Sequence, residues 1–552
     1  MNAETAYLFR HALLRDAAYQ LQLPGNRAKL HALAFELIEV VAGGRAPRPA
    51  PLVAGPQPKS KPHSSDPFAH ELAWHAQASL AGAQHPGLAA ALKLYLRRGA
   101  EHEERCFRHD PGCSQWQEYA DLVAGMERSV SLFRAGIAAW RAGRPQVAEK
   151  LYRRVLTNSR ATGNKRLAGL VWGNMALLLK ETGRVRVAER ACKKALALHR
   201  SVGNRKATAV ELGTMAFIYA DTGRIERAER AFSKALDIQS QLDDRRSQGA
   251  TLGNLASFLL DTSRMNEAEQ TYQRALDINR KVGDRGFESV VLANLASLYH
   301  ITGRIELAEK TVRQALALTR EVGQRRFEGV ILGDLALVLA DTGRREQAEP
   351  TYQQALSMHR EVGDRRYEGV VLGRLANLFH QTSRNELAEQ TYQQALTCFR
   401  DVGQRRFEGA ALANLASLYH ESGRLALAES TYKRALGIHR SVQDRSSEGI
   451  TLECLANLYL ATGRLDHATR AFEEALSIHR ELRNRRLEGS CLCDFALLLL
   501  AVQDSKHARE LWNSGARILR TIGDGHELDR KLLAMREACA KAAVQPFDEP
   551  SA

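Results

Sequence analysis

The side chains that most often carry out chemistry are scattered along this chain of 552 residues. His102 and Cys106, and likewise His109 and Cys113, are separated by three residues, a spacing only weakly typical of zinc ligands. None of the eight cysteines forms a Cys-x-x-Cys pair. The sequence has no phosphate-binding GxxxxGK[ST] loop, and no nucleophile–base pair or paired carboxylates are apparent. We therefore expect a protein without enzymatic activity, with neither a metal site nor a cofactor.

One column of mostly polar residues recurs every 40 residues and suits binding better than catalysis. The column, which we call the inner column, reads Asn174, Thr214, Asn254, Asn294, Asp334, Arg374, Asn414, Cys454 and Asp494. An asparagine amide offers both a donor and an acceptor, so a ladder of them suits the backbone of an extended peptide. We predict that a peptide or partner protein contacts Asn174, Asn254, Asn294, Asp334, Arg374, Asn414 and Asp494. The alternative is that these residues are ordinary polar surface or bond within the array.

Arginines at repeated positions account for most of the formal net charge of +15. One column follows a turn, and a glutamate column opposes it, which favours ion pairs between repeats over a basic binding stripe. The columns are Arg184, Arg224, Arg264, Arg304, Arg344, Arg384, Arg424 and Arg464, and Glu149, Glu189, Glu229, Glu269, Glu309, Glu349, Glu389 and Glu429. Another column opens a helix, where the helix dipole disfavours a cation. Its members are therefore candidate contacts for an acidic partner: Arg325, Arg326, Arg365, Arg366, Arg405 and Arg406.

These columns keep register because one unit of 40 residues is repeated ten times over 124–523 without an insertion. The alanine at its centre falls at 148 and then at every fortieth residue up to 508. A fixed period of this size predicts a solenoid, whose units bury their apolar faces against their neighbours. In the unit 364–403, Asp364 is a suitable N-cap for a helix over 365–381, and a second helix follows over 385–402. Most sister repeats carry glycine in the intervening turn, which suits a left-handed residue after a helix.

Helical geometry places the inner column away from the core. At about 100° per residue, Leu412, Leu415, Ala416 and Tyr419 share one face of a helix, and Asn414 points to the opposite side. The inner column should therefore line the concave surface of the solenoid.

The repeat resembles a known family. The spacing Leu412-x2-Leu415-Ala416-x2-Tyr419, then Gly423, then Ala428-x3-Tyr432-x2-Ala435, is similar to the tetratricopeptide signature. HEAT repeats are the alternative, but they lack the second half of this pattern. The period of 40 exceeds the usual 34, and arginine replaces the terminal proline. The repeats therefore look like the longer ones of kinesin light chain and Pins-type scaffolds, which hold extended peptides.

This resemblance implies an all-α fold, a superhelical α-α solenoid of tetratricopeptide hairpins. In kinesin light chain, asparagines at this motif position are implicated in cargo binding, which supports the choice of the inner column. Small alanines in both helices would let the two helices of a hairpin approach closely.

The rest of the chain divides into four further segments. We expect a helical segment at 1–42, interrupted by a turn at Pro24-Gly25, and a proline-rich extended linker at 43–67. Residues 68–123 predict a helical adaptor with helices at 68–80 and 88–107 and a loop at 108–117. Residues 524–545 predict a helix that caps the last repeat. The stretch FRHALLRDAAY at residues 9–19 resembles the tail of ATPase modules in bacterial signal-transduction regulators.

The leading hypothesis is a scaffold for protein binding in bacterial signalling. The sequence begins without a secretory signal, and its longest apolar run, 495–502, is too short to span a bilayer, so we expect a cytoplasmic protein without a membrane partner. One alternative is an effector-sensing arm of an NTPase or transcriptional regulator. A less favoured alternative is a nucleic-acid-binding solenoid, because only 6% of the residues are aromatic and could stack on bases.

Overall fold

The computed structural model describes residues 24–53, 55, 60–81 and 86–548. It divides into two compact units, Met1–Val171 and Trp172–Ala552. Within the described residues every regular element is a helix, as expected of an all-α fold.

The described residues of the first unit form six α-helices and one short 3-10 helix. They are α2 (Pro24–Val41), the 3-10 helix Asp66–Phe68, α3 (Ala69–Leu80), α4 (Pro86–Arg105), α5 (His109–Asp121), α6 (Gly125–Arg141) and α7 (Pro145–Ala161). The helices expected at 68–80 and 88–107 are confirmed as α3 and α4. Pro24 and Gly25 both lie in α2, so the turn expected there is not present. Residues 9–19, which resemble an ATPase tail, lie outside the described residues.

The loop expected at 108–117 is wrong, because α5 occupies most of it. Pro111 is the third residue of this helix, and a proline in the first turn removes no backbone hydrogen bond. Trp116 and Tyr119 are buried on one face of α5. The apolar face therefore outweighs the turn-forming pair Pro111-Gly112.

The described residues of the proline-rich segment before Asp66 form no regular element, and the segment is held against α4. Arg98 of α4 donates to Asp66 Oδ1 at 2.7 Å and to the backbone carbonyls of Pro47 and Lys61 at 3.1 and 3.0 Å. Arg98 and Asp66 are both buried. A buried ion pair therefore holds part of this segment against α4.

The repeats form hairpins of a helix A followed by a helix B. Helices A are α8 (Lys165–Glu181), α10 (Arg205–Asp221), α12 (Arg245–Asp261), α14 (Arg285–Ile301), α16 (Arg325–Asp341), α18 (Arg365–Gln381), α20 (Arg405–Glu421), α22 (Arg445–Ala461) and α24 (Arg485–Ala501). Helices B are α9 (Val185–Ser201), α11 (Ile225–Gln241), α13 (Met265–Lys281), α15 (Ile305–Val322), α17 (Arg345–Glu361), α19 (Asn385–Asp401), α21 (Leu425–Ser441), α23 (Leu465–Glu481) and α25 (Ser505–Ile522). A last helix, α26 (Gly525–Lys541), follows them. The bounds predicted for the unit 364–403 agree with α18 and α19 to within one residue.

The turns have the backbone conformation that the glycines predicted. Gly423, between α20 and α21, has a φ of 76°, in the left-handed region that glycine adopts without strain. Ser383, which stands at the same position between α18 and α19, has a φ of 59°.

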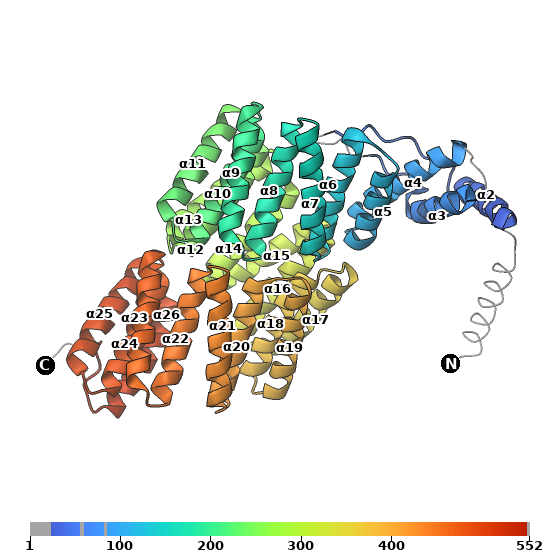
Figure 1. Cartoon of the computed structure of the whole chain (residues 1–552). Helices are drawn as coiled ribbons and strands as arrows, with labels where there is room; N and C mark the ends of the chain where they lie inside the picture. The colour runs from blue at the N-terminus through green and yellow to red at the C-terminus, as the bar shows by residue number, and fades with distance from the viewer. Residues whose placement is uncertain (1–23, 54, 56–59, 82–85, 549–552) are drawn as a thin grey trace, which may run out of the picture. The chain divides into compact units, whose positions relative to one another are not determined.

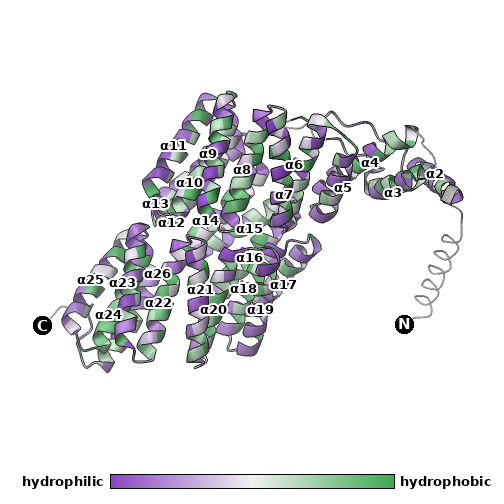
Figure 2. Cartoon of the chain, in the orientation of Figure 1, coloured by the Kyte–Doolittle hydropathy of each residue, from purple (hydrophilic) through white to green (hydrophobic). Residues whose placement is uncertain are grey.

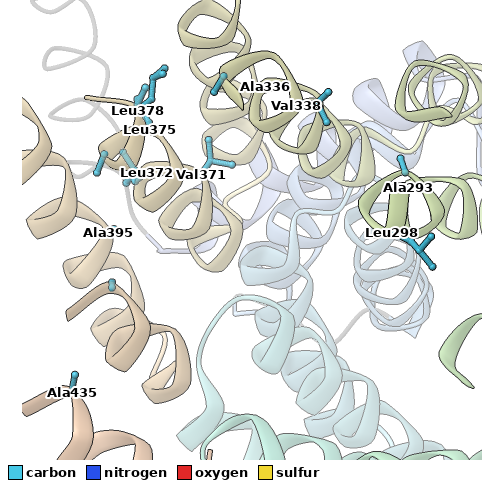
Figure 3. Packing of buried hydrophobic residues seen from close by; sticks show 14 of the residues in the cluster. Ala293, Leu298, Ala336, Val338, Val371, Leu372, Leu375, Leu378, Ala395 and Ala435 are labelled. Carbon is cyan, nitrogen blue, oxygen red and sulfur yellow. The ribbon is translucent and has the colours of Figure 1, made fainter. Parts of the chain in front are cut away.

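A single apolar core runs through the repeats of the second unit. Its buried residues extend without a break between repeats from Ala216 to Ile518. The central Ala388 and Ala428 of helices B have no exposed surface. In Figure 2 apolar residues lie where helices face each other and polar residues cover the outside, and Figure 3 shows leucines of α18 beside Ala395 of α19. Each repeat therefore buries its apolar surface against its neighbours, as expected for a solenoid.

Helices A and B lie on opposite sides of this solenoid. Helices A of adjacent repeats approach each other more closely than helices B of adjacent repeats do. Such a difference curves the array, so helices A line its inner side.

The curvature brings early and late repeats of the second unit together. We call the repeats of residues 172–281 the first tier and those of residues 365–522 the second tier; Figure 1 shows α9–α11 above α22–α25. Arg366 pairs with Glu181 at 3.1 Å, and Arg483 pairs with Glu226 at 2.9 Å.

Candidate protein-binding surface

The inner column lies on the open side of helices A. In α20, Leu412, Leu415 and Tyr419 are buried in the core, whereas Asn414 is exposed. Asn254 is likewise exposed, and Asn294 is half-buried. Because the other faces of these helices are packed, the open face is the inner one.

Side chains of the inner column in adjacent repeats are close enough to touch. Arg374 of α18 donates to Asp334 of α16, with 2.6 Å between Nη1 and Oδ1. Near the end of the array, Lys531 of α26 donates to Asp494 at 2.5 Å. These predicted binding residues thus lie in one row, but Asp334, Arg374 and Asp494 are already engaged with one another or with α26.

Three asparagines of the inner column keep their amides free. No hydrogen bond joins the side chain of Asn254, Asn294 or Asn414 to another residue in the described ranges. Asn174, in contrast, has a partner within the chain. The donors and acceptors of the three free amides are therefore available to a ligand.

A column of small residues, which the sequence reading did not single out, runs beside these asparagines. It holds Gly173, Gly213, Gly253, Ala293, Gly333, Gly373 and Ala413, each one residue before the inner column. A methyl group added at Gly213 or Gly373 would have no atom within 4 Å, so open space adjoins the backbone there. At Gly173, Gly253 and Gly333 the same group would instead meet a side chain of the next helix A. The signal was present as glycine and alanine at a fixed offset from the asparagines.

The arginines that follow the turns form the predicted ion pairs between repeats. From Arg224 onwards each pairs with a glutamate 35 residues earlier: Arg224–Glu189, Arg264–Glu229, Arg304–Glu269, Arg344–Glu309, Arg384–Glu349, Arg424–Glu389 and Arg464–Glu429. The hydrogen bond from Arg224 is the main reason that the pKa of Glu189 is lowered to about 2. This part of the positive charge is structural.

The six arginines proposed to meet an acidic partner are also paired within the chain. The pairs are Arg325–Glu328, Arg326–Asp364, Arg365–Glu368, Arg366–Glu181, Arg405–Glu408 and Arg406–Asp444. These carboxylates offset the unfavourable position of the arginines near a helix start. They lie three residues later in the same helix, at the N-cap of the next helix A, or in the other tier. These pairs satisfy the arginines within the chain, and contact with an acidic partner stays a prediction for them.

A cluster of metal ligands and a helix that could span a membrane are both absent from the described residues. Among them, no group of three or more His, Cys, Asp and Glu side chains could hold a metal ion. None of the described helices is both long and apolar enough to cross a bilayer.

Comparisons with known proteins agree with this architecture. Sequence models of the tetratricopeptide repeat match residues 167–241, 247–321, 327–401, 371–441 and 450–486, together more than half of the chain. Comparison with curated protein sequences gives no match.

Two similar solved structures share low sequence identity with the chain. One is a Rap protein complexed with competence and sporulation factor, at 15% identity and a TM-score of 0.45, covering 65% of this chain and 99% of that one. Another is BtubC (BKLC) from P. vanneervenii, at 19% identity and a TM-score of 0.33, covering 41% of this chain and 92% of that one. On the evidence of the matching sequence models and the helical hairpins, this chain belongs to the tetratricopeptide repeat family.

Proposed function

We propose that the protein is a non-catalytic scaffold that binds an extended peptide, or an extended segment of a partner protein, along the inner column. The observation that carries this proposal is the row of free amides at Asn254, Asn294 and Asn414 on the open face of helices A. The resemblance of the repeats to those of kinesin light chain, which hold extended peptides, supports the same use.

The chemistry of this row favours a peptide backbone. Each amide can accept a backbone N–H and donate to a backbone carbonyl, and the open space beside Gly213 and Gly373 lets a chain approach helices A. Each hydrogen bond contributes about 0.5–1.5 kcal/mol. Affinity would therefore be spread over several repeats rather than concentrated in one pocket.

Placement in a bacterial signalling pathway is the finer part of the proposal. It rests on the resemblance of residues 9–19 to the tail of an ATPase module in bacterial regulators.

The test compares inner and outer amides. Peptides that bind the full chain are selected from a random display library, and their affinity is measured by fluorescence polarisation. We expect the triple variant Asn254→Ala, Asn294→Ala, Asn414→Ala to lose at least about tenfold in affinity, since three hydrogen bonds of modest strength disappear.

The matched control removes three exposed amides from helices B: Asn266→Ala, Gln354→Ala and Gln394→Ala. This variant should bind selected peptides like the original chain. The proposal fails if no peptide is selected, or if the inner triple variant keeps its helicity by circular dichroism and binds with unchanged affinity.

A further inference from the structure

A ladder of ion pairs joins the two tiers, and one of its rungs lacks the cation. The acid that ends a helix A in the first tier meets an arginine 185 residues later: Glu181 pairs with Arg366 at 3.1 Å, and Asp221 pairs with Arg406 at 3.4 Å. The next acid in this series is Asp261, the last residue of α12. The residue 185 positions after it is Ser446, so the side chain that would complete the third rung is missing.

A cavity of about 330 Å³ occupies this position, and both Asp261 and Ser446 line it. Its volume is within the range of small-molecule sites. Phe258, Met265 and Ile301 contribute apolar wall from the first half of the array, and Ile450, Leu482 and Leu487 contribute apolar wall from the second tier. The cavity thus combines apolar walls with a few polar groups, as ligand sites do.

Among the described charged groups around the cavity, one carboxylate has no cationic partner. Asp221 is paired with Lys180 at 3.0 Å, Asp444 is paired with Arg406 at 2.7 Å, and Arg486 is paired with Asp524 at 2.6 Å. In the described part of the chain, Asp261 makes neither a hydrogen bond nor an ion pair.

The surroundings of Asp261 disfavour its negative charge. Asp261 is exposed and lines the cavity, yet residues of both tiers lie around its carboxyl group and displace part of its water. This desolvation is the main reason that the pKa of Asp261 is raised to about 6; Asp221 acts in the same direction, and Arg406 and Lys180 act against it. At pH 7 and above the group is mostly ionised, and a cation placed beside it would remove an unfavourable, unpaired charge.

We propose that the cavity between the tiers binds a small organic cation, an ammonium group on an apolar body. The ammonium group pairs with Asp261 in the space that Ser446 leaves open. The apolar body lies against Phe258 and Met265 on one side and Ile450 and Leu487 on the other. This site is separate from the inner column, and its ligand would join the tiers in the same way as the arginines of the other two rungs.

The probe is phenethylammonium chloride, titrated into the full chain at pH 8 and followed by isothermal calorimetry. Phosphate buffer is used because amine buffers would compete. We expect saturable one-site binding that falls at least tenfold in the variant Asp261→Asn. Phenethyl alcohol, which has no charge, should bind weakly and equally to both proteins.

Asp341→Asn is the matched control. Asp341 ends α16 as Asp261 ends α12, but it pairs with His300 at 2.8 Å and does not line the cavity. This variant should bind the probe like the original chain, and so should the inner triple variant.

Ser446→Arg tests the same site without removing the acid. An arginine at this position should pair with Asp261, raise the thermal midpoint, and reduce probe binding at least tenfold. Absence of binding to the original chain overturns the proposal, as does an affinity in either the Asp261→Asn or the Ser446→Arg variant equal to that of the original chain. If Asp261→Asn fails to fold, the Ser446→Arg variant decides.

Discussion

Arg464 pairs with Glu429 across a repeat boundary, with 2.9 Å between Nη2 and Oε2, while its guanidinium lies 4.5 Å from the centre of the Tyr459 ring. The glutamate belongs to helix B of one repeat, and the arginine and tyrosine belong to the next. Arg224, Arg304 and Arg424 repeat this arrangement with their own glutamates and tyrosines. One side chain thus joins consecutive repeats by charge and by ring contact.

A double-mutant cycle on Arg464→Ala and Glu429→Ala should give a coupling energy of about 0.2–1 kcal/mol, because the pair is partly exposed. Urea unfolding measures the cycle. The hydrogen bond from Arg464 is the main reason that the pKa of Glu429 is lowered to about 2. Since the folded pKa lies below the unfolded value of about 4.3, the contribution is complete above that value. It is lost as the pH falls towards 2, and a coupling energy that stays constant over this range would contradict the pairing.

Enlarging a central alanine should destabilise the array. Ala428 has no exposed surface, so Ala428→Leu forces extra methyl groups into a filled core and should cost about 1–3 kcal/mol. Chemical denaturation gives the value. Ala426→Leu, two residues earlier on the exposed face of the same helix, should change stability by less than about 0.5 kcal/mol. Equal effects at the two positions would show that the hairpin does not need a small residue there.

Buried histidines should make the array sensitive to mild acid. His439 has no exposed surface, and neither ring nitrogen has a hydrogen-bond partner among the described residues. Burial lowers the pKa of His439, with Asp444 and Glu448 acting in the opposite direction and Arg406 in the same one. As the pH falls, His439 is therefore protonated in the unfolded chain before it is protonated in the folded chain. The free energy of unfolding then decreases below about pH 6.5, and one histidine accounts for at most about 1.4 kcal/mol of this decrease at pH 5.5.

Another repeat of the chain supplies the comparison residue. Phe399 occupies the same position and packs against Gly369 as His439 packs against Gly409. His439→Phe should therefore fold and lose part of the difference in unfolding free energy between pH 7.5 and pH 5.5. An unchanged difference would mean that His439 does not titrate on unfolding.

Removing α26 should expose apolar surface and promote aggregation. Trp512 of α25, together with Met535 and Cys539 of α26, is buried in the closing cluster of the array. Deleting residues 524–552 should lower the thermal midpoint and increase light scattering. A truncated chain that stays monomeric with the original midpoint would contradict a capping function for α26.

The local structure of the repeats was predictable because each signal is local. The N-cap Asp364 accepts a hydrogen bond from the backbone N–H of Tyr367 at 3.2 Å, as its position before an apolar run indicates. Glycine at position 423 likewise predicted the turn after α20. The spacing of Leu412, Leu415 and Tyr419 predicted the buried face of this helix. The pairing of Arg464 with Glu429 followed from the two opposed columns.

The contacts that cross long distances were not predictable in this way. The meeting of Arg366 with Glu181 depends on the small rotation between consecutive repeats, summed over almost five units. No single residue encodes that sum. The ion pairs between the tiers, and the place of Ser446 among them, could therefore be found only in the three-dimensional structure. For the same reason Arg98, an unremarked basic residue in an apolar helix, gave no sign that it would bind Asp66 and hold the proline-rich segment.

The contacts between the tiers also have a mechanical consequence. A solenoid whose repeats touch only their neighbours extends like an open spring when its ends are pulled. In the unit Trp172–Ala552 the two tiers are joined by ion pairs of Arg366, Arg406 and Arg483. Under tension this unit should remain stiff until those ion pairs break. Only then should the superhelix lengthen, with its hairpins still folded.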